Sequence, residues 1–124
     1  VGLLAAGAEQ PDPVRGDWSA ASGFDAWARM PASDVTAIFA ANDQMALGAL
    51  RALAGSGLRV PDDVAVIGFD DIADAANFQP PLTTVRQDFD ALGERAVSAL
   101  VEWIEGARPA DLLLAPALIR RASA

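Results

Sequence analysis

Two short apolar runs, with an amphipathic stretch between them, constrain the fold of this chain more than any other feature. The runs occupy residues 35–40 (VTAIFA) and 64–69 (VAVIGF) and are almost wholly apolar. Strands without a polar face are typical of parallel sheets that helices cover on both sides. The sequence therefore predicts an α/β fold in which these two runs are parallel strands.

The stretch between the two runs predicts a helix that begins at Asn42. Asn is a favourable N-cap residue, and Asp43 places a negative charge in the first turn, where the helix dipole stabilises it. Apolar residues then recur at helical spacing: Ala46, Leu47, Leu50, Leu53 and Ala54. Gly55, Gly57 and Pro61 are expected to end the helix. Strand, helix and strand in this order form a right-handed parallel unit.

Two further helices are predicted on either side of this unit. One covers residues 19–30, with Phe24 and Trp27 facing inward and Pro31 closing it. The other covers residues 88–105 and ends at Gly106. Its apolar residues also recur at helical spacing: Phe89, Leu92, Ala96, Val97, Leu100, Val101 and Ile104.

The remaining segments predict extended structure, apart from the first residues. We interpret residues 80–85 (PPLTTV) as an extended connector and residues 112–114 and 118–119 as short strands separated by Pro116. Residues 1–6 resemble the end of a helix that stops at Gly7. Because a doubly wound sheet usually opens with a strand and a helix, we expect the fold to be incomplete at its N-terminus.

Composition excludes several classes of function. The net charge of −8 repels nucleic acid phosphates, so these residues alone are not expected to bind DNA. The chain has no Cys, which excludes disulfides and thiolate metal sites and agrees with a cytoplasmic location. No apolar run approaches the roughly 20 residues of a membrane span, and the N-terminus has no basic region of the signal-peptide kind.

Enzymatic activity is not expected either. The chain has no His, so Ser19 and Ser22 lack the usual general base. Asp70 and Asp71 are adjacent and would point to opposite sides of an extended backbone, which makes a poor acid–base pair. No calcium-loop spacing or His-based metal motif is present, so no metal or cofactor is expected.

Polar and aromatic residues lie where a ligand of such a sheet would bind, beyond the carboxyl ends of the strands. Asn42 follows the first strand, Asp70 and Asp71 follow the second, and Trp18 lies in the loop before the first helix. Carboxylate and amide oxygens accept hydrogen bonds from vicinal hydroxyls, and an indole face covers the C–H side of a sugar ring. Each residue also has a structural interpretation: Asn42 as an N-cap, the Asp pair as a turn and Trp18 as packing.

Five motifs give this pattern a specific resemblance. They occur in order: GDWSAASGF (16–24), ANDQMALGA (41–49), GLRVPDDV (57–64), IGFDDI (67–72) and PPLTTVRQD (80–88). Together they resemble the effector-binding domain of the lac/gal repressor family of bacterial transcription regulators. The resemblance runs from about Asp17 to Arg121 and is closer than the similarity to periplasmic sugar-binding proteins of the same fold.

The resemblance implies a two-lobed, type I periplasmic-binding-protein-like fold, of which this chain supplies most of the C-terminal lobe. Residues 1–86 would belong to that lobe, residues 87–116 would cross into the N-terminal lobe, and residues 117–124 would return. A sugar effector between the lobes would contact Trp18, Asn42, Gln44, Asp70, Phe89 and Leu92. A homodimer or larger homo-oligomer would form through Leu47, Leu50 and Phe78.

The resemblance also implies how such a protein acts. In this family, an effector bound between the lobes changes the grip of the dimer on operator DNA through an N-terminal helix-turn-helix, which the 124 residues do not contain. We therefore expect a cytoplasmic, non-enzymatic repressor fragment. The alternative is a periplasmic sugar-binding protein of the same fold, which a signal peptide in place of a helix-turn-helix would identify.

Overall fold

A four-stranded sheet forms the centre of the structure, a computed structural model that describes residues 12–30, 35–111 and 113–124. The elements follow the order α2 (Ala20–Trp27), β1 (Ala37–Phe39), α3 (Asp43–Gly55), β2 (Ala65–Asp70), the 3-10 helix η1 (Ala75–Asn77), β3 (Thr83–Arg86), α4 (Phe89–Ile104) and β4 (Ala117–Ile119). The expected N-terminal helix end, Pro31 and Leu112 lie outside the described residues.

The sheet confirms the predicted parallel unit and adds two strands to it. Its order is β1-β2-β3-β4; the first three strands are parallel, and β4 runs antiparallel to β3. The prediction of a connector over residues 80–85 was wrong, because Thr83 and Thr84 pair with Ile67 and Gly68 in a central strand. Their hydroxyls are satisfied by hydrogen bonds inside the fold, so a polar sequence forms a buried strand.

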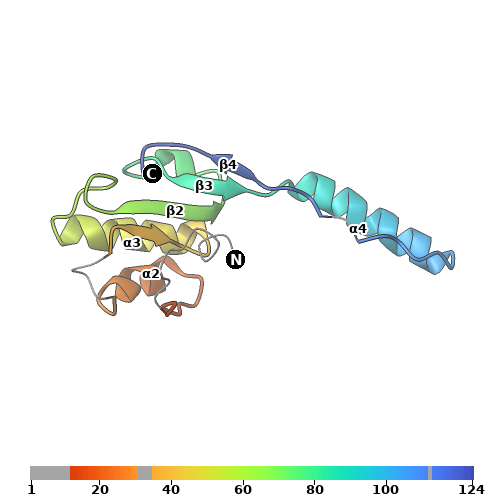
Figure 1. Cartoon of the computed structure of the whole chain (residues 1–124), viewed down its shortest axis with the longest axis horizontal. Helices are drawn as coiled ribbons and strands as arrows, with labels where there is room; N and C mark the ends of the chain where they lie inside the picture. The colour runs from red at the N-terminus through yellow and green to blue at the C-terminus, as the bar shows by residue number, and fades with distance from the viewer. Residues whose placement is uncertain (1–11, 31–34, 112) are drawn as a thin grey trace.

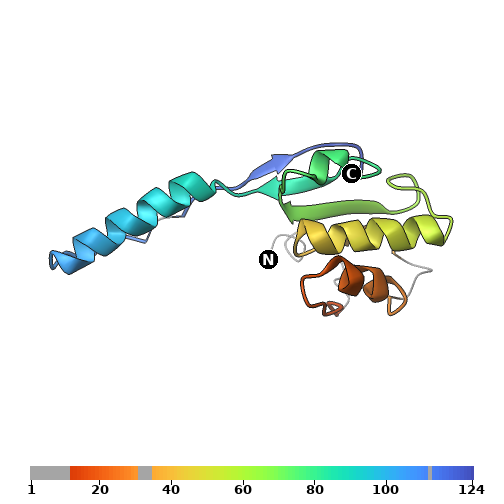
Figure 2. The ribbon, with the colours of Figure 1, turned by 180° about the vertical axis from the view of Figure 1, so that it is seen from behind.

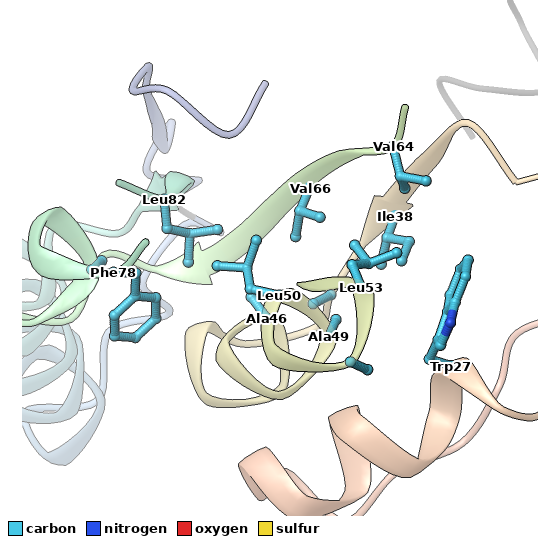
Figure 3. Close-up of a cluster of buried hydrophobic side chains, with 13 residues drawn as sticks. Trp27, Ile38, Ala46, Ala49, Leu50, Leu53, Val64, Val66, Phe78 and Leu82 are labelled. Atoms are coloured by element: carbon cyan, nitrogen blue, oxygen red, sulfur yellow. The ribbon is translucent and has the colours of Figure 1, made fainter. Parts of the chain in front are cut away.

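The main hydrophobic core lies between the sheet and α3 (Figure 3). Leu53 of α3, Val66 of β2 and Leu82, just before β3, are fully buried there. The predicted apolar stripe of α3 is confirmed for Ala46, Leu50 and Leu53, whereas Ala54 is exposed. The caps are as expected at the start of α3: Asn42 accepts a hydrogen bond from the amide of Met45.

Only one face of β1 is covered by the described residues, which corrects the expectation of helices on both faces. Ile38 points into the core, while the side chain of Phe39 is 63% exposed on the opposite face and contacts Phe69 edge-on. Phe24 was also predicted to face inward and is exposed. The reason is that α2 packs on α3 and not on the sheet, so that only Trp27 reaches the core (Figure 3).

The two helices α2 and α3 approach each other closely through glycine. A Cβ on Gly48 would overlap the backbone carbonyl of Ala20, and a Cβ on Gly23 would overlap the backbone of Met45. Backbone atoms cannot move aside as a flexible side chain can. This contact holds the loop before α2 close to the N-terminus of α3.

Helix α4 projects away from the sheet as an arm (Figure 1), and the chain returns along it to β4 (Figure 2). Asp88 caps its N-terminus, and Gly106 follows it with a positive φ of 88°, as predicted. No residue of α4 is buried, and its apolar side chains, such as Leu100 and Trp103, are exposed. Leu113 and Leu114 form no strand, contrary to prediction, whereas β4 confirms the strand at residues 118–119. No helix of the described segments has the length and apolar content to cross a membrane.

Gly48→Ala should destabilise the protein, because the added methyl group collides with the carbonyl of Ala20. We expect the free energy of unfolding to fall by about 1–3 kcal/mol. Gly93→Ala is the matched control, since nothing lies within 4 Å of a Cβ at this position in α4, where Ala favours the helix. Urea denaturation followed by circular dichroism measures both; equal effects of the two changes would contradict the close contact.

Candidate functional site

The candidate residues gather at the edge of the sheet where β1 and β2 end. Phe39 is in register with Ile67, so the segments that follow the two strands, with Asn42 and Asp70, leave the sheet on the same side. Helix α3 begins there, and its first turn lies against the loop after β2. Ligands of open parallel sheets bind at such an edge.

Asn42 connects the start of α3 to the loop that carries Trp18. Its Oδ1 accepts from the amide of Met45 at 2.8 Å, and its Nδ2 donates to the carbonyl oxygen of Trp18 at 3.0 Å. The N-cap interpretation of Asn42 is therefore correct. One N–H of its amide group is still available for a ligand, because an Asn side chain has two donors.

The loop holds Trp18 in an unusual conformation. Its φ is 72°, in the left-handed region, and its indole is 64% exposed. Asp17 braces the loop by accepting from the amide and hydroxyl of Ser19, and these hydrogen bonds lower the pKa of Asp17 to about 2. The packing interpretation of Trp18 does not hold within the described residues, since its ring is left open to solvent.

Asp70 and Phe89 lie together in an open hollow of about 640 Å³ beside the base of the arm. Gln87 Nε2 is 3.5 Å from Asp70 Oδ1, a long hydrogen bond. Burial and the nearby negative charge of Asp43 raise the pKa of Asp70, and the contact from Gln87 opposes them. The backbone at Asp70 has a φ of 109°, which L-residues rarely adopt.

A buried carboxylate, Asp43, joins the two halves of the site. Its Oδ2 accepts from the amide of Ile72 at 2.9 Å and its Oδ1 accepts from the hydroxyl of Thr84 at 2.5 Å. The side chain is fully buried against Gly68, where a Cβ would leave no room for it. The sequence pattern assigned Asp43 only to the first helical turn, and no local signal indicates its long-range partners.

Asp71 forms the second buried carboxylate of this edge and does more than shape a turn. Arg86 Nε and Arg121 Nη2 donate to its two oxygens at 2.6 and 2.7 Å. Burial raises the pKa of Asp71, but the hydrogen bonds from Arg121 and Arg86 outweigh it and leave the pKa lowered. The two adjacent aspartates at the end of β2 thus have different environments.

Two predicted contact residues lie apart from these groups. Gln44 is exposed in the first turn of α3, and Leu92 lines a groove of about 750 Å³ along α4 and not the hollow beside Asp70. Of the predicted dimer residues, Leu47 is half-buried. Leu50 is only 3% exposed and Phe78 is also buried, because both pack into the core of this chain and offer little surface to a partner.

The chemistry of the site is that of binding. Its side chains supply carboxylate acceptors, one amide donor and two exposed aromatic rings. In the described segments no three acidic residues cluster as metal ligands would, and the chain has neither His nor Cys. A polyhydroxylated molecule would find acceptors for its hydroxyls and apolar faces for its ring carbons.

Comparison with known proteins gives consistent matches along the chain. Residues 4–124 match the family model of the periplasmic binding protein-like domain. The chain is 47% identical to the lactose operon repressor of Escherichia coli K12, over 86% of this chain and 30% of that protein. It is 42% identical to the HTH-type transcriptional regulator CelR of Thermobifida fusca, over 98% of this chain and 37% of that protein.

Solved structures agree with these matches. A lac repressor dimer bound to operator and the anti-inducer ONPF superposes with a TM-score of 0.89 at 41% identity, over 98% of this chain and 43% of that chain. A complex of the regulator CelR with cellobiose gives a TM-score of 0.85 at 42% identity, over 98% of this chain and 39% of that chain. The chain thus spans well under half of the relatives it matches.

Asp71→Asn should remove a pH-dependent contribution to stability. Because the folded-state pKa of Asp71 lies below 3.8, its ion pairs stabilise the fold above pH 3.8 and lose this effect as the pH falls further. We expect a loss of about 1.5–3 kcal/mol at pH 7 that shrinks on acidification. Thermal unfolding of both forms between pH 2.5 and 7 measures it, and a constant difference over this range would contradict the assignment.

Proposed function

This chain belongs to the periplasmic binding protein-like domain family, in the group of the lac/gal repressors, and from that premise we propose that it is the effector-sensing part of a bacterial transcription regulator. One observation carries the proposal. The residues that match the family motifs, Trp18, Asn42 and Asp70, lie at one edge of the sheet: Asn42 donates to the carbonyl of Trp18, and its neighbour Asp43 accepts from the amide of Ile72, two residues after Asp70.

The proposed effector is a sugar that binds at this edge. Asp70 and the free N–H of Asn42 would bond its hydroxyls, while the rings of Trp18 and Phe89 would cover its carbon faces. Gln44 and Leu92 would be reached only by a larger ligand or after closure of the second lobe. The solved complex of the regulator CelR with cellobiose, a disaccharide, supports a sugar as the effector.

The lobe boundaries are proposed from the shape of the chain. As the family resemblance implies, residues 1–86 would belong to the lobe built on the sheet, residues 87–116 would cross into the other lobe, and residues 117–124 would return. The exposed apolar side chains of α4 support this division, since such a surface requires cover from another part of the protein. That other part, with the helix-turn-helix, would lie outside these 124 residues.

The proposed protein is cytoplasmic, works as a homodimer and is not an enzyme. The lac repressor structure described above is a dimer bound to operator, which supports both partners for a protein of this group. The alternative, a periplasmic sugar-binding protein, shares the fold, but the relatives described above are transcription regulators.

Asp70→Ala in the full-length regulator should abolish induction and leave operator binding intact. Loss of a charge-assisted hydrogen bond costs about 1.5–3 kcal/mol, or roughly 10- to 150-fold in effector affinity. Titration calorimetry with lactose, cellobiose and ribose, together with an operator-binding assay, measures both effects. Asp74→Ala is the control, since Asp74 is exposed nearby and its side chain caps no helix. Unchanged sugar affinity in the Asp70 variant would refute its role.

Leu47→Ala should weaken the proposed dimer. Leu47 lies on α3, half-buried at the edge of the core, so part of its side chain is available to a partner. We expect its truncation to raise the dimer dissociation constant at least about fivefold, as for a moderate interface contact of about 1 kcal/mol. Light scattering over a dilution series measures this, with Asp62→Ala, in the exposed loop beyond the C-terminus of α3, as control. A dimer equally stable in both variants would place the interface elsewhere.

A further inference from the structure

We propose that Asp71, through its ion pairs with Arg86 and Arg121, is a positioning residue that aims Asp70 and connects the effector site to β3, which leads into the arm, and to the segment that follows β4. The part of this inference that concerns the effector rests on the proposed function. The three residues are called the Asp71 cluster below.

Both oxygens of the Asp71 carboxylate are bonded in the cluster. The side chain of Asp71 is 4% exposed, and each oxygen has its own guanidinium partner. Arg86 approaches Oδ2 with both Nε and Nη2, and Arg121 approaches Oδ1 with Nη2. The Nη1 group of Arg121 also donates to the carbonyl of Leu82 at 2.7 Å. The planar forks therefore determine the orientation of the carboxylate as well as its charge.

The backbone between the two aspartates explains how this orientation reaches Asp70. Asp70 and Asp71 have φ values of 109° and 54°, so the chain makes a sharp turn in a region that side chains disfavour. Such a turn persists only where surrounding contacts over-determine it. The contacts here include the two ion pairs of Asp71, the bond from the Ile72 amide to Asp43 and a long bond of 3.4 Å from the Asp71 amide to the hydroxyl of Thr84. If the ion pairs are lost, only these backbone bonds and the long contact from Gln87 still orient Asp70.

The topology connects the same carboxylate to the arm. Arg86 is the last residue of β3, just before Asp88 caps α4, and Arg121 follows β4 on the way back. The chain leaves the sheet and returns to it between these two arginines. Asp71 therefore bonds the last residue of β3, at the base of the arm, and also the segment that follows β4, next to the hollow that holds Asp70 and Phe89.

The two arginines differ in how exposed their side chains are to a ligand in the hollow. The side chain of Arg121 is 17% exposed and has a second partner, whereas that of Arg86 is 56% exposed and lines the hollow itself. A ligand beside Asp70 would lie next to Arg86, whose exposed pair with Asp71 is the weaker of the two. A ligand bound in the hollow would therefore act on β3 through the ion pair between Arg86 and Asp71.

The test compares Arg86→Met with Arg86→Lys and with Arg59→Met in the full-length regulator. Arg59 is a matched control, because it is exposed and pairs with Asp63 and Asp62 away from the arm. We expect Arg86→Met to lower affinity for whichever of lactose, cellobiose and ribose binds by on the order of tenfold, with a smaller fall in melting temperature than Asp71→Asn, which removes both ion pairs. Arg86→Lys should restore most of the sugar affinity, and Arg59→Met should leave the sugar affinity unchanged.

A second measurement does not need a ligand. Hydrogen exchange of the unliganded protein should become faster in Arg86→Met at residues 70–73, 83–88 and 117–121 together, with α3 unchanged. Exchange rates in these three segments that equal those of the parent protein would overturn the inference. Unchanged sugar affinity in Arg86→Met would also overturn it, provided that Asp70→Ala abolishes binding. If neither variant alters binding of any sugar, the proposed function fails, and the exchange pattern alone then decides whether the Asp71 cluster joins the strands.

Discussion

The buried carboxylate of Asp43 is the contact on which the arrangement of this edge depends. It begins α3, yet its two oxygens bond the amide of Ile72 in the loop after β2 and the hydroxyl of Thr84 in β3. A buried carboxylate without such donors would be strongly destabilising, so helix, loop and strand must take these positions together. Gly68 leaves the space that the carboxylate needs. Asn42, next to it, then brings the Trp18 loop to the same edge by one amide bond.

The arm is the second determinant of how this chain can work. Helix α4 has good caps and an apolar sequence, but in the described structure it packs against neither the sheet nor the other helices (Figure 1). Its attachment to the sheet is polar: the Asp71 cluster ties β3 to the segment after β4, beside the candidate effector residues. Under the proposed function, a ligand in the hollow beside Asp70 would contact both the edge of the sheet and the base of the arm.

Local patterns predicted the elements whose stability comes from local causes. The start of α3 at Asn42, the helix over residues 88–105 and the two apolar strands are all confirmed, because capping and hydrophobic periodicity act within a few residues. The strand at Thr83–Arg86 was missed, since its buried face is made of threonines whose hydroxyls find partners only in the folded chain. Phe24 was predicted to face inward, and the run at residues 35–40 was predicted to be covered on both faces. Because α2 packs on α3 and one face of β1 is uncovered by the described residues, Phe24 and Phe39 are exposed.

The sequence by itself determined the α/β class, the parallel unit and the family resemblance, and it indicated Trp18, Asn42 and Asp70 as candidates at the edge. Only the tertiary structure decided how these residues are held. Asp70 and Asp71 are neighbours of identical chemistry, yet one faces an open hollow with a raised pKa and the other is buried between two arginines with a lowered pKa. This difference depends on Arg86, Arg121 and Asp43, which are far from the pair along the chain. Charge interactions and burial depend on distance in space, and no sequence pattern within a few residues of Asp70 encodes these distances.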